Sequence, residues 1–131
     1  MYAHIQLGVQ DLGAMTAFYD VVLSSLGWVR VSFSTHPSPA GVIWRVPGSR
    51  WPQFVLNKPV NGQPATAANG SQVSFFCMSR AMVDKAWIAA VSAGATDEGT
   101  PGIRYVYAPD FYAAYCRDPE GHKLCFVHTD G

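Results

Sequence analysis

Two segments of the chain alternate apolar and polar residues over the length of a strand. The first spans residues 4–9 and the second spans residues 72–77. Side chains two residues apart on a strand lie on the same face, so alternation predicts a strand with one apolar and one polar face. The polar faces begin with His4 and Gln72. If the apolar face packs on a helix, these two residues are predicted to line the opposite face, where a cavity would lie.

Each predicted strand is followed by an apolar stripe with the spacing of an amphipathic helix. The first helix is predicted to begin near Asp11 and to end at Gly27, and the second to begin near Ser79 and to end at Gly94. Strand, cap, helix and glycine therefore recur at an offset of about 68 residues, which predicts two copies of one structural unit. The stripes are Leu12, Met15, Phe18, Tyr19, Val22 and Leu26, and then Val83, Ala86, Trp87, Ala90 and Val91.

Three further strands are predicted after each helix, separated by turns rich in Pro and Gly. They are placed at 28–34, 42–46 and 53–56 in the first half, and at 103–107, 112–117 and 123–128 in the second. Residues 118–121, Asp-Pro-Glu-Gly, predict a type I turn between the last two strands. We therefore predict one α+β domain of residues 1–131. It would consist of two tandem βαβββ modules, about 1–59 and about 70–131, joined by a linker at about 60–69 and forming a curved mixed sheet around a cavity.

The composition of the chain gives no support for nucleic acid or a membrane as a binding partner. The 131 residues include nine basic and nine acidic side chains, so no net charge favours nucleic acid or an anionic membrane. No apolar run reaches the roughly 20 residues that span a bilayer. Three cysteines form an odd set without a CxxC pair, and the first ten residues carry no apolar leader. We expect reduced thiols, a cytoplasmic location and, because the chain is short and uncharged overall, a homodimer.

Several common kinds of site have no support in the sequence. The chain contains no GxSxG, Walker, GxGxxG or HExxH motif. Cys116 and Cys125 are interpreted as inert buried thiols because nothing nearby would lower their pKa. Arg104 is interpreted as a solvated charge at a strand edge, with contact to an anionic ligand as the alternative. Among the many aromatic residues of the later strands, Trp44 and Tyr112 are the two predicted to line a pocket.

Two longer segments carry a family resemblance. Residues 4–12, His-Ile-Gln-Leu-Gly-Val-Gln-Asp-Leu, followed by Phe18-Tyr19 and Leu26-Gly27, resemble the opening of a module of the vicinal oxygen chelate superfamily. This superfamily includes glyoxalases, bleomycin-resistance proteins and extradiol dioxygenases. Residues 112–124 resemble the closing hairpin of its second module. The resemblance covers essentially the whole chain and implies the paired-module fold predicted above.

The resemblance also implies a divalent metal held by four side chains, two from each module. Carried over position by position, the ligand positions fall on His4, Gln53, Gln72 and Cys125. Metal-dependent relatives have at least one carboxylate in this set, and here there is none. Divalent ions such as Mg²⁺ and Mn²⁺ prefer charged oxygen ligands, and zinc rarely takes amides. We therefore expect no metal cofactor and at most weak divalent metal binding.

These considerations favour a glyoxalase/bleomycin-resistance-like protein that binds a small apolar or aromatic molecule in the cavity of its sheet. The alternatives are a metal-dependent lyase, isomerase or dioxygenase of the glyoxalase kind, and a fold used only for self-association. A metal-free enzyme also stays open, because His4 could serve as a base. The predicted ligand-binding residues are His4, Trp44, Gln53, Gln72, Tyr112 and Cys125.

Overall fold

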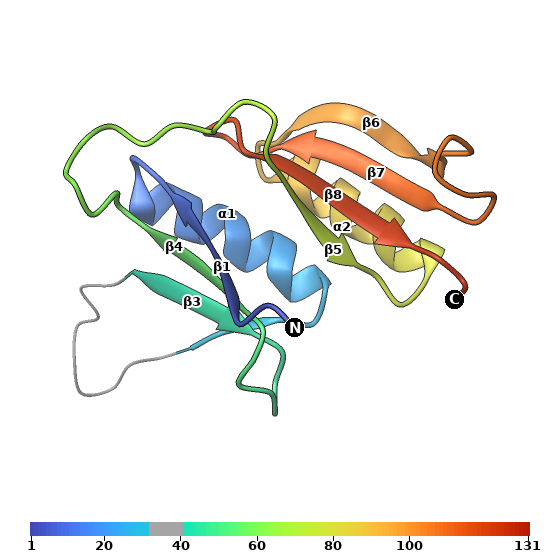
Figure 1. Cartoon of the computed structure of the whole chain (residues 1–131), viewed down its shortest axis with the longest axis horizontal. Coiled ribbons are helices and arrows are strands. Elements are labelled where there is room, and N and C mark those ends of the chain that lie inside the picture. The colour runs from blue at the N-terminus through green and yellow to red at the C-terminus, as the bar shows by residue number, and fades with distance from the viewer. Residues whose placement is uncertain (32–40) are drawn as a thin grey trace. The chain divides into compact units, whose positions relative to one another are not determined.

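The computed structural model describes residues 1–31 and 41–131 and contains two compact units. Unit 1 is Met1–Thr66 and unit 2 is Ala67–Gly131, so the boundary falls inside the segment predicted as a linker. Each unit has one helix and one four-stranded mixed sheet in the order βαβββ (Figure 1). The prediction of two tandem βαβββ modules is confirmed.

Unit 1 builds its sheet in the order β1-β4-β3-β2. Strand β1 runs parallel to β4, and the remaining pairs are antiparallel. The strand predicted at 28–34 is present as β2, while residues 32–34 lie outside the described residues. The elements are β1 (His4–Gly8), α1 (Leu12–Ser25), β2 (Val29–Arg30), β3 (Val42–Arg45) and β4 (Gln53–Asn57).

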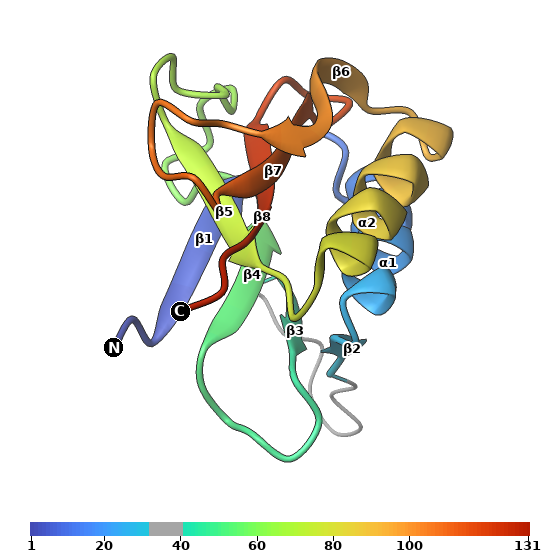
Figure 2. The same cartoon turned by 90° about the vertical axis from the view of Figure 1, so that its right-hand side faces the viewer.

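Unit 2 repeats this topology in the order β5-β8-β7-β6, again with the first and last strands parallel. Its helix packs on β6, β7 and β8 and covers one face of the sheet (Figure 2). We call the opposite face of this sheet the distal face. The elements are β5 (Gln72–Phe76), α2 (Arg80–Ser92), β6 (Thr96–Ile103), β7 (Tyr112–Arg117) and β8 (Lys123–His128).

Both helices begin at the predicted caps. A side-chain oxygen of Asp11 accepts a hydrogen bond from the backbone N–H of Ala14 at 3.0 Å, and the Ser79 hydroxyl accepts one from Met82 at 3.1 Å. Each bond satisfies an N–H that has no partner within the helix. Gly27 and Gly94 follow the last turns with positive φ angles of 81° and 113°, the conformation that glycine adopts without steric cost.

The apolar stripes of the two helices form the two cores, with small differences from the predicted residues. In α1 the buried residues are Met15, Phe18, Tyr19, Val22 and Leu23, so Leu23 takes the place predicted for Leu26. In α2 they are Val83, Ala86 and Ala90, whereas Val91 is exposed. The helix-facing side chains of β8, Leu124 and Phe126, are fully buried.

The strand predicted at 103–107 is wrong. Strand β6 ends at Ile103, and residues 104–107 form a turn closed by the Tyr107 N–H donating to the Arg104 carbonyl at 3.0 Å. Residues 96–102, where no strand is predicted, pair with β7 through two register shifts. Bulges and edge strands tolerate Gly and Pro, and β6 is both bulged and at the sheet edge.

No helix in residues 1–31 or 41–131 has the length and apolar character needed to cross a membrane.

Candidate functional site

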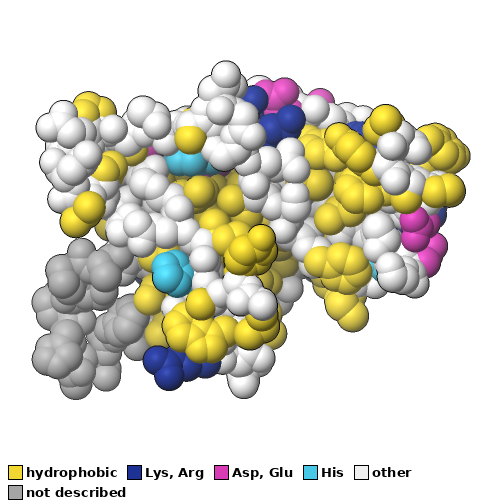
Figure 3. Space-filling view, viewed as in Figure 1, with side chains coloured by type: hydrophobic (Ala, Val, Ile, Leu, Met, Phe, Trp, Pro, Cys, Tyr) yellow, Lys and Arg dark blue, Asp and Glu magenta, His cyan; other side chains and the backbone are white. Residues whose placement is uncertain are grey.

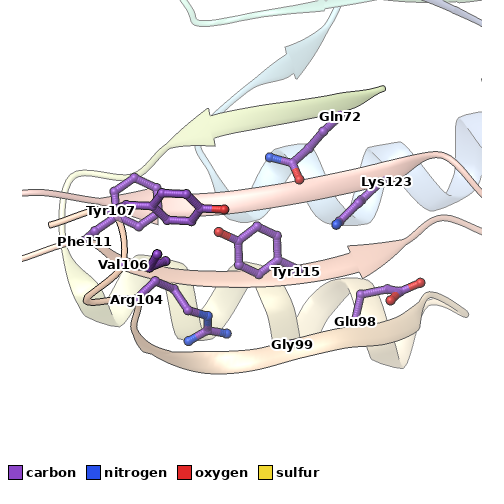
Figure 4. Close-up of a pocket in the computed structure, with 9 residues that line it drawn as sticks. All are labelled: Gln72, Glu98, Gly99, Arg104, Val106, Tyr107, Phe111, Tyr115 and Lys123. Atoms are coloured by element: carbon purple, nitrogen blue, oxygen red, sulfur yellow. The ribbon is translucent and has the colours of Figure 1, made fainter. Parts of the chain in front are cut away.

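Unit 2 contains a cavity of about 750 Å³ on the distal face of its sheet (Figure 4). In the β7–β8 register Tyr115 pairs with Cys125, one residue away from the Ala114–Phe126 pair that faces α2. Alternation therefore turns Tyr115 and Lys123 toward the distal face, because Leu124 and Phe126 occupy the helix-facing core. A volume of this size is within the range of small-molecule sites.

Three aromatic rings form walls of the cavity. Tyr107 and Phe111 come from the connection between β6 and β7, and Tyr115 comes from β7. The centroids of Tyr107 and Phe111 are 5.1 Å apart with an interplanar angle of 58°. Their connection is closed by the Arg104 N–H, which donates to the Phe111 carbonyl at 2.8 Å. The walls are thus apolar, planar and anchored to the sheet.

Arg104 is held in a fixed position at the cavity. Its Nη1 donates to the Gly102 carbonyl at 2.9 Å, and its Nη2 donates to the Thr100 carbonyl at 2.7 Å. The guanidinium carbon lies 5.4 Å from the centroid of the Tyr115 ring. Two glycines leave room for this group, because a Cβ on Gly99 would lie 3.0 Å from Nη2 and a Cβ on Gly102 would lie 3.1 Å from Nη1.

A second cation approaches the same ring. The Lys123 Nζ lies 5.5 Å from the Tyr115 centroid. The cavity also has one carboxylate, Glu98, which pairs with Arg117 at 2.5 Å. Among the described residues neither Arg104 nor Lys123 forms an ion pair with an acidic side chain. The positive charge of these two groups is therefore available to a ligand.

The two protonatable groups beside these cations are neutral at physiological pH. Burial is the main cause that raises the pKa of the Tyr115 phenol to about 12, and the neighbouring Cys125 adds to it. Burial also raises the pKa of the Cys125 thiol. Tyr115 consequently presents an uncharged ring, and Cys125 is a protonated thiol rather than a nucleophile.

The residues predicted from the sequence are divided between the two units. His4 and Gln53 are register partners in the β1–β4 pair of unit 1, and the Gln53 Nε2 donates to the Arg50 carbonyl at 3.0 Å. Gln72 lines the cavity of unit 2. Cys125 is buried on the same sheet, and its partner on β5 is Ser74 rather than Gln72. Figure 4 shows Gln72 and Lys123 close to Tyr115.

Trp44 and Tyr112, the two aromatic residues predicted to line a pocket, each contact a helix. Trp44 is 1% exposed, and its indole N–H donates to Asp20 of α1 at 2.9 Å. The Tyr112 hydroxyl donates to Asp84 of α2 at 2.6 Å. Neither lines the cavity. Of the three aromatic walls that the prediction missed, only Tyr115 lies on a strand, where alternation places it on the face opposite the buried Ala114 and Cys116.

The donor groups present do not fit the divalent metal that the family resemblance implies. Unit 1 offers an imidazole and an amide, and unit 2 offers an amide and a thiol whose pKa is raised by burial. Metals bind the thiolate, so coordination would first have to overcome that raised pKa. In residues 1–31 and 41–131 no three His, Cys, Asp or Glu side chains are grouped as a metal site would require.

Comparison with known proteins agrees with the fold. The family model for the Glyoxalase/Bleomycin resistance protein/Dioxygenase superfamily matches residues 2–126. The chain is 36% identical to a glyoxalase/bleomycin resistance protein from Albidiferax ferrireducens T118, with a TM-score of 0.80 and 98% of each chain covered. No curated protein gives a significant match.

More distant solved structures share the fold. One is a glyoxalase/bleomycin resistance protein/dioxygenase family enzyme from Burkholderia phytofirmans PsJN, with 20% identity, a TM-score of 0.71 and 97% of each chain covered. Another is a putative glyoxalase from Bacillus halodurans, with 22% identity, a TM-score of 0.68, and 98% of this chain and 95% of that chain covered.

Proposed function

The chain belongs to the Glyoxalase/Bleomycin resistance protein/Dioxygenase superfamily, and on that basis we propose that it binds a small apolar or aromatic molecule without a catalytic metal. The binding site is the cavity on the distal face of unit 2. The observation that supports this most directly is the set of aromatic walls formed by Tyr107, Phe111 and Tyr115. Flat rings of this kind contact a planar ligand over a large area and add favourable ring–ring interactions.

The metal-dependent alternative, a lyase, isomerase or dioxygenase, has less support. In those reactions a metal polarises a substrate oxygen or binds the reacting species, and the metal must be held firmly by the protein. His4 and Gln53 supply no charge to such a site, and Cys125 is a buried thiol with a raised pKa. The donor chemistry therefore supports binding more than metal-assisted catalysis.

Calorimetric titration of the purified protein with 2-naphthol and with indole tests the proposal. The proposal expects saturable binding in metal-chelating buffer. The variant Phe111→Ala removes one wall and is expected to weaken binding by about tenfold, because ring–ring contact and the lost apolar area together contribute about 1.5 kcal/mol. Phe76→Ala is the matched control, since Phe76 is 60% exposed on β5 and does not line the cavity.

Two results would overturn the proposal. One is the absence of saturable binding for both probes up to millimolar concentration. The other is binding that Phe111→Ala and Phe76→Ala weaken equally, which would place the ligand elsewhere. Binding that appears only after a divalent metal is added would instead support the metal-dependent alternative.

A further inference from the structure

We propose that the ligand of this cavity is a small aromatic carboxylate, whose ring stacks among the aromatic walls while its carboxylate is bound by Arg104 and Lys123. This inference rests on the proposed binding function and specifies its ligand class. Figure 4 shows Tyr115 in the middle of the group, with Arg104 and Lys123 on either side of its ring. The cavity therefore places positive charge directly beside an aromatic surface.

The charges of the lining residues favour an anionic ligand. Arg104 and Lys123 are positive and Glu98 is negative, and no other lining residue carries a formal charge at neutral pH. Glu98 already contacts Arg117 outside the cavity lining. Because the charge of Glu98 is paired with Arg117, the charges of Arg104 and Lys123 are left for an anionic ligand such as a carboxylate.

The geometry of Arg104 suits a carboxylate. A guanidinium has five N–H donors in a planar fork, which matches the two oxygens of a carboxylate. Bonds to the Gly102 and Thr100 carbonyls use two of these donors and fix the plane of the group. Because the side chain is already immobilised, binding a ligand costs little additional side-chain entropy.

Tyr115 lies beside the positions proposed for both the ring and the carboxylate of the ligand. Its ring is contacted by both cations, at 5.4 Å from the Arg104 guanidinium carbon and 5.5 Å from the Lys123 Nζ. A ligand ring that packs beside Tyr115 therefore lies within reach of both positive groups. A carboxylate attached directly to that ring can approach them without leaving the aromatic surface.

The experiment compares three probes in calorimetric titrations: 2-naphthoate, 2-naphthamide and cyclohexanecarboxylate. The amide keeps the shape of naphthoate and removes its charge, and the cyclohexane compound keeps the charge and removes the aromatic ring. We expect 2-naphthoate to bind at least tenfold more tightly than either of the others. Raising the salt concentration from 50 to 500 mM should weaken only the carboxylates, because screening acts on charge pairs.

Three variants locate the effect. Arg104→Gln and Lys123→Gln should each weaken 2-naphthoate by about tenfold and change 2-naphthamide by less than twofold. Arg80→Gln is the matched control, because the Arg80 guanidinium lies over the Tyr112 ring at 5.2 Å but on the helix-facing side of the same sheet. It should leave both affinities unchanged. Arg104 also forms hydrogen bonds to β6, so Arg104→Gln could fail to fold. In that case Lys123→Gln still tests the proposal.

The outcomes separate this inference from the proposed function. If 2-naphthoate and 2-naphthamide bind equally and Arg104→Gln and Lys123→Gln affect neither, the cavity binds aromatic molecules but the carboxylate assignment is wrong. If none of the three probes binds and the neutral probes of the preceding experiment also fail, the binding function itself is wrong. Equal weakening of naphthoate by Arg80→Gln would show a nonspecific charge effect and would also overturn the assignment.

Discussion

Tyr115 and the residues around it determine what the cavity can bind. Its ring is held between two cations, and its phenol stays protonated because burial raises its pKa to about 12. The position of Arg104 depends in turn on a missing side chain, since Gly99 leaves room for its Nη2. A small residue on β6 thus controls where a positive charge is placed.

The variant Gly99→Ala tests this dependence. An added Cβ would lie 3.0 Å from the Arg104 Nη2 and 3.1 Å from the Tyr115 Cδ2, closer than ordinary van der Waals contact. Gly99 also has a φ angle of 158°, a conformation that residues with a side chain rarely adopt, so the change strains the backbone of β6 as well. The guanidinium is the end of a flexible side chain, so we expect it to move while the fold persists. Affinity for 2-naphthoate should fall by about fivefold to tenfold, corresponding to about 1 to 1.4 kcal/mol, with no matching change for 2-naphthamide. Gly13→Ala, in α1, serves as the control and should leave both affinities unchanged.

The buried thiols give a prediction for alkaline pH. Burial is the main cause that raises the pKa of Cys77 to about 11 and that of Cys116 to about 12, from an ordinary value of 9.0. The unfolded chain therefore releases these protons at lower pH than the folded protein does. The stabilisation from the protonated thiols is fully present below pH 9 and is lost as the pH rises through 11 to 12.

We expect the free energy of unfolding, measured by urea denaturation at a series of pH values, to decrease above pH 9. The folded thiols should also react slowly with a thiol reagent at pH 8 and rapidly once urea unfolds the chain. Cys77→Ala and Cys116→Ala together should flatten the alkaline decrease. A free energy that is constant from pH 9 to 11, or fast labelling of the folded protein, would contradict the raised pKa values.

At the scale of elements, the β7–β8 hairpin is held by several hydrogen bonds around Asp118. A turn is present at the predicted position, with the Gly121 N–H donating to the Asp118 carbonyl at 2.9 Å. Asp118 Oδ1 also accepts hydrogen bonds from the backbone N–H groups of Glu120 and His122, at 2.9 and 3.0 Å. His122, to which the sequence assigned no role, is buried, and its Nδ1 lies 2.9 Å from Asp118 Oδ2. This hairpin sets the register that turns Tyr115 and Lys123 to the distal face.

Replacing Asp118 should therefore destabilise unit 2. Asp118 is 3% exposed, so Asp118→Ala leaves several buried donors without their acceptor. We expect a loss of about 2 to 4 kcal/mol in the free energy of unfolding, measured by urea denaturation. Asp130→Ala is the control, because the Asp130 side chain is 71% exposed and its contact with His128 spans 3.5 Å. A change below about 0.5 kcal/mol for Asp118→Ala would show that the turn backbone alone sets the hairpin.

At the scale of the whole molecule, the two units share one topology but differ in what their sheets carry. Unit 2 has the aromatic cavity and the two cations, whereas in unit 1 His4 and Gln53 are register partners at the start of β1 and β4. Hydrophobic side chains also gather on the surface at the end of unit 2 that carries the β6–β7 connection (Figure 3). There Tyr105, Val106 and Tyr107 are 78%, 84% and 67% exposed.

The donor chemistry leads to a prediction about metals. We expect the purified protein to contain less than one equivalent of Ni²⁺, Mn²⁺, Fe²⁺ or Zn²⁺ by elemental analysis. Adding any of them should barely change the melting temperature. By contrast, 2-naphthoate at 100 times its dissociation constant should stabilise the fold by about 2.7 kcal/mol and raise the midpoint by several degrees. One tightly bound ion per chain that is lost in His4→Ala would restore the metal-dependent alternative.

Self-association is the last prediction at this scale. A chain with no net charge has little electrostatic repulsion between copies, and an exposed aromatic cluster such as Tyr105 with Tyr107 is unusual for a monomer. We propose a homodimer, for which light scattering at micromolar concentration should give twice the chain mass of 14.2 kDa. Tyr105→Ser combined with Tyr107→Ser should shift the mass toward the monomer if this cluster lies in the interface. A monomeric wild-type protein would refute the dimer.

The sequence by itself determined the repeat and most of the elements. Alternation, the caps at Asp11 and Ser79 and the glycines after the helices are local signals, because each depends on the backbone bonds and packing of a few neighbouring residues. The type I turn at Asp118 was predicted for the same reason. The family resemblance agreed with the two-module fold, and the comparison with known proteins confirmed the family.

Only the tertiary structure decided which residues meet at the cavity. Trp44 and Tyr112 are residue types that often line pockets, but the strand register turns their side chains toward the helices. The position of Arg104 depends on how the bulged strand β6 pairs with β7. The Gly and Pro residues of β6 kept the sequence pattern from predicting this strand. Hydrogen bonds between residues far apart in the sequence determine which side chains of neighbouring strands lie on the same face of the sheet. A local pattern predicts that a side chain alternates, but it does not specify what lies opposite it.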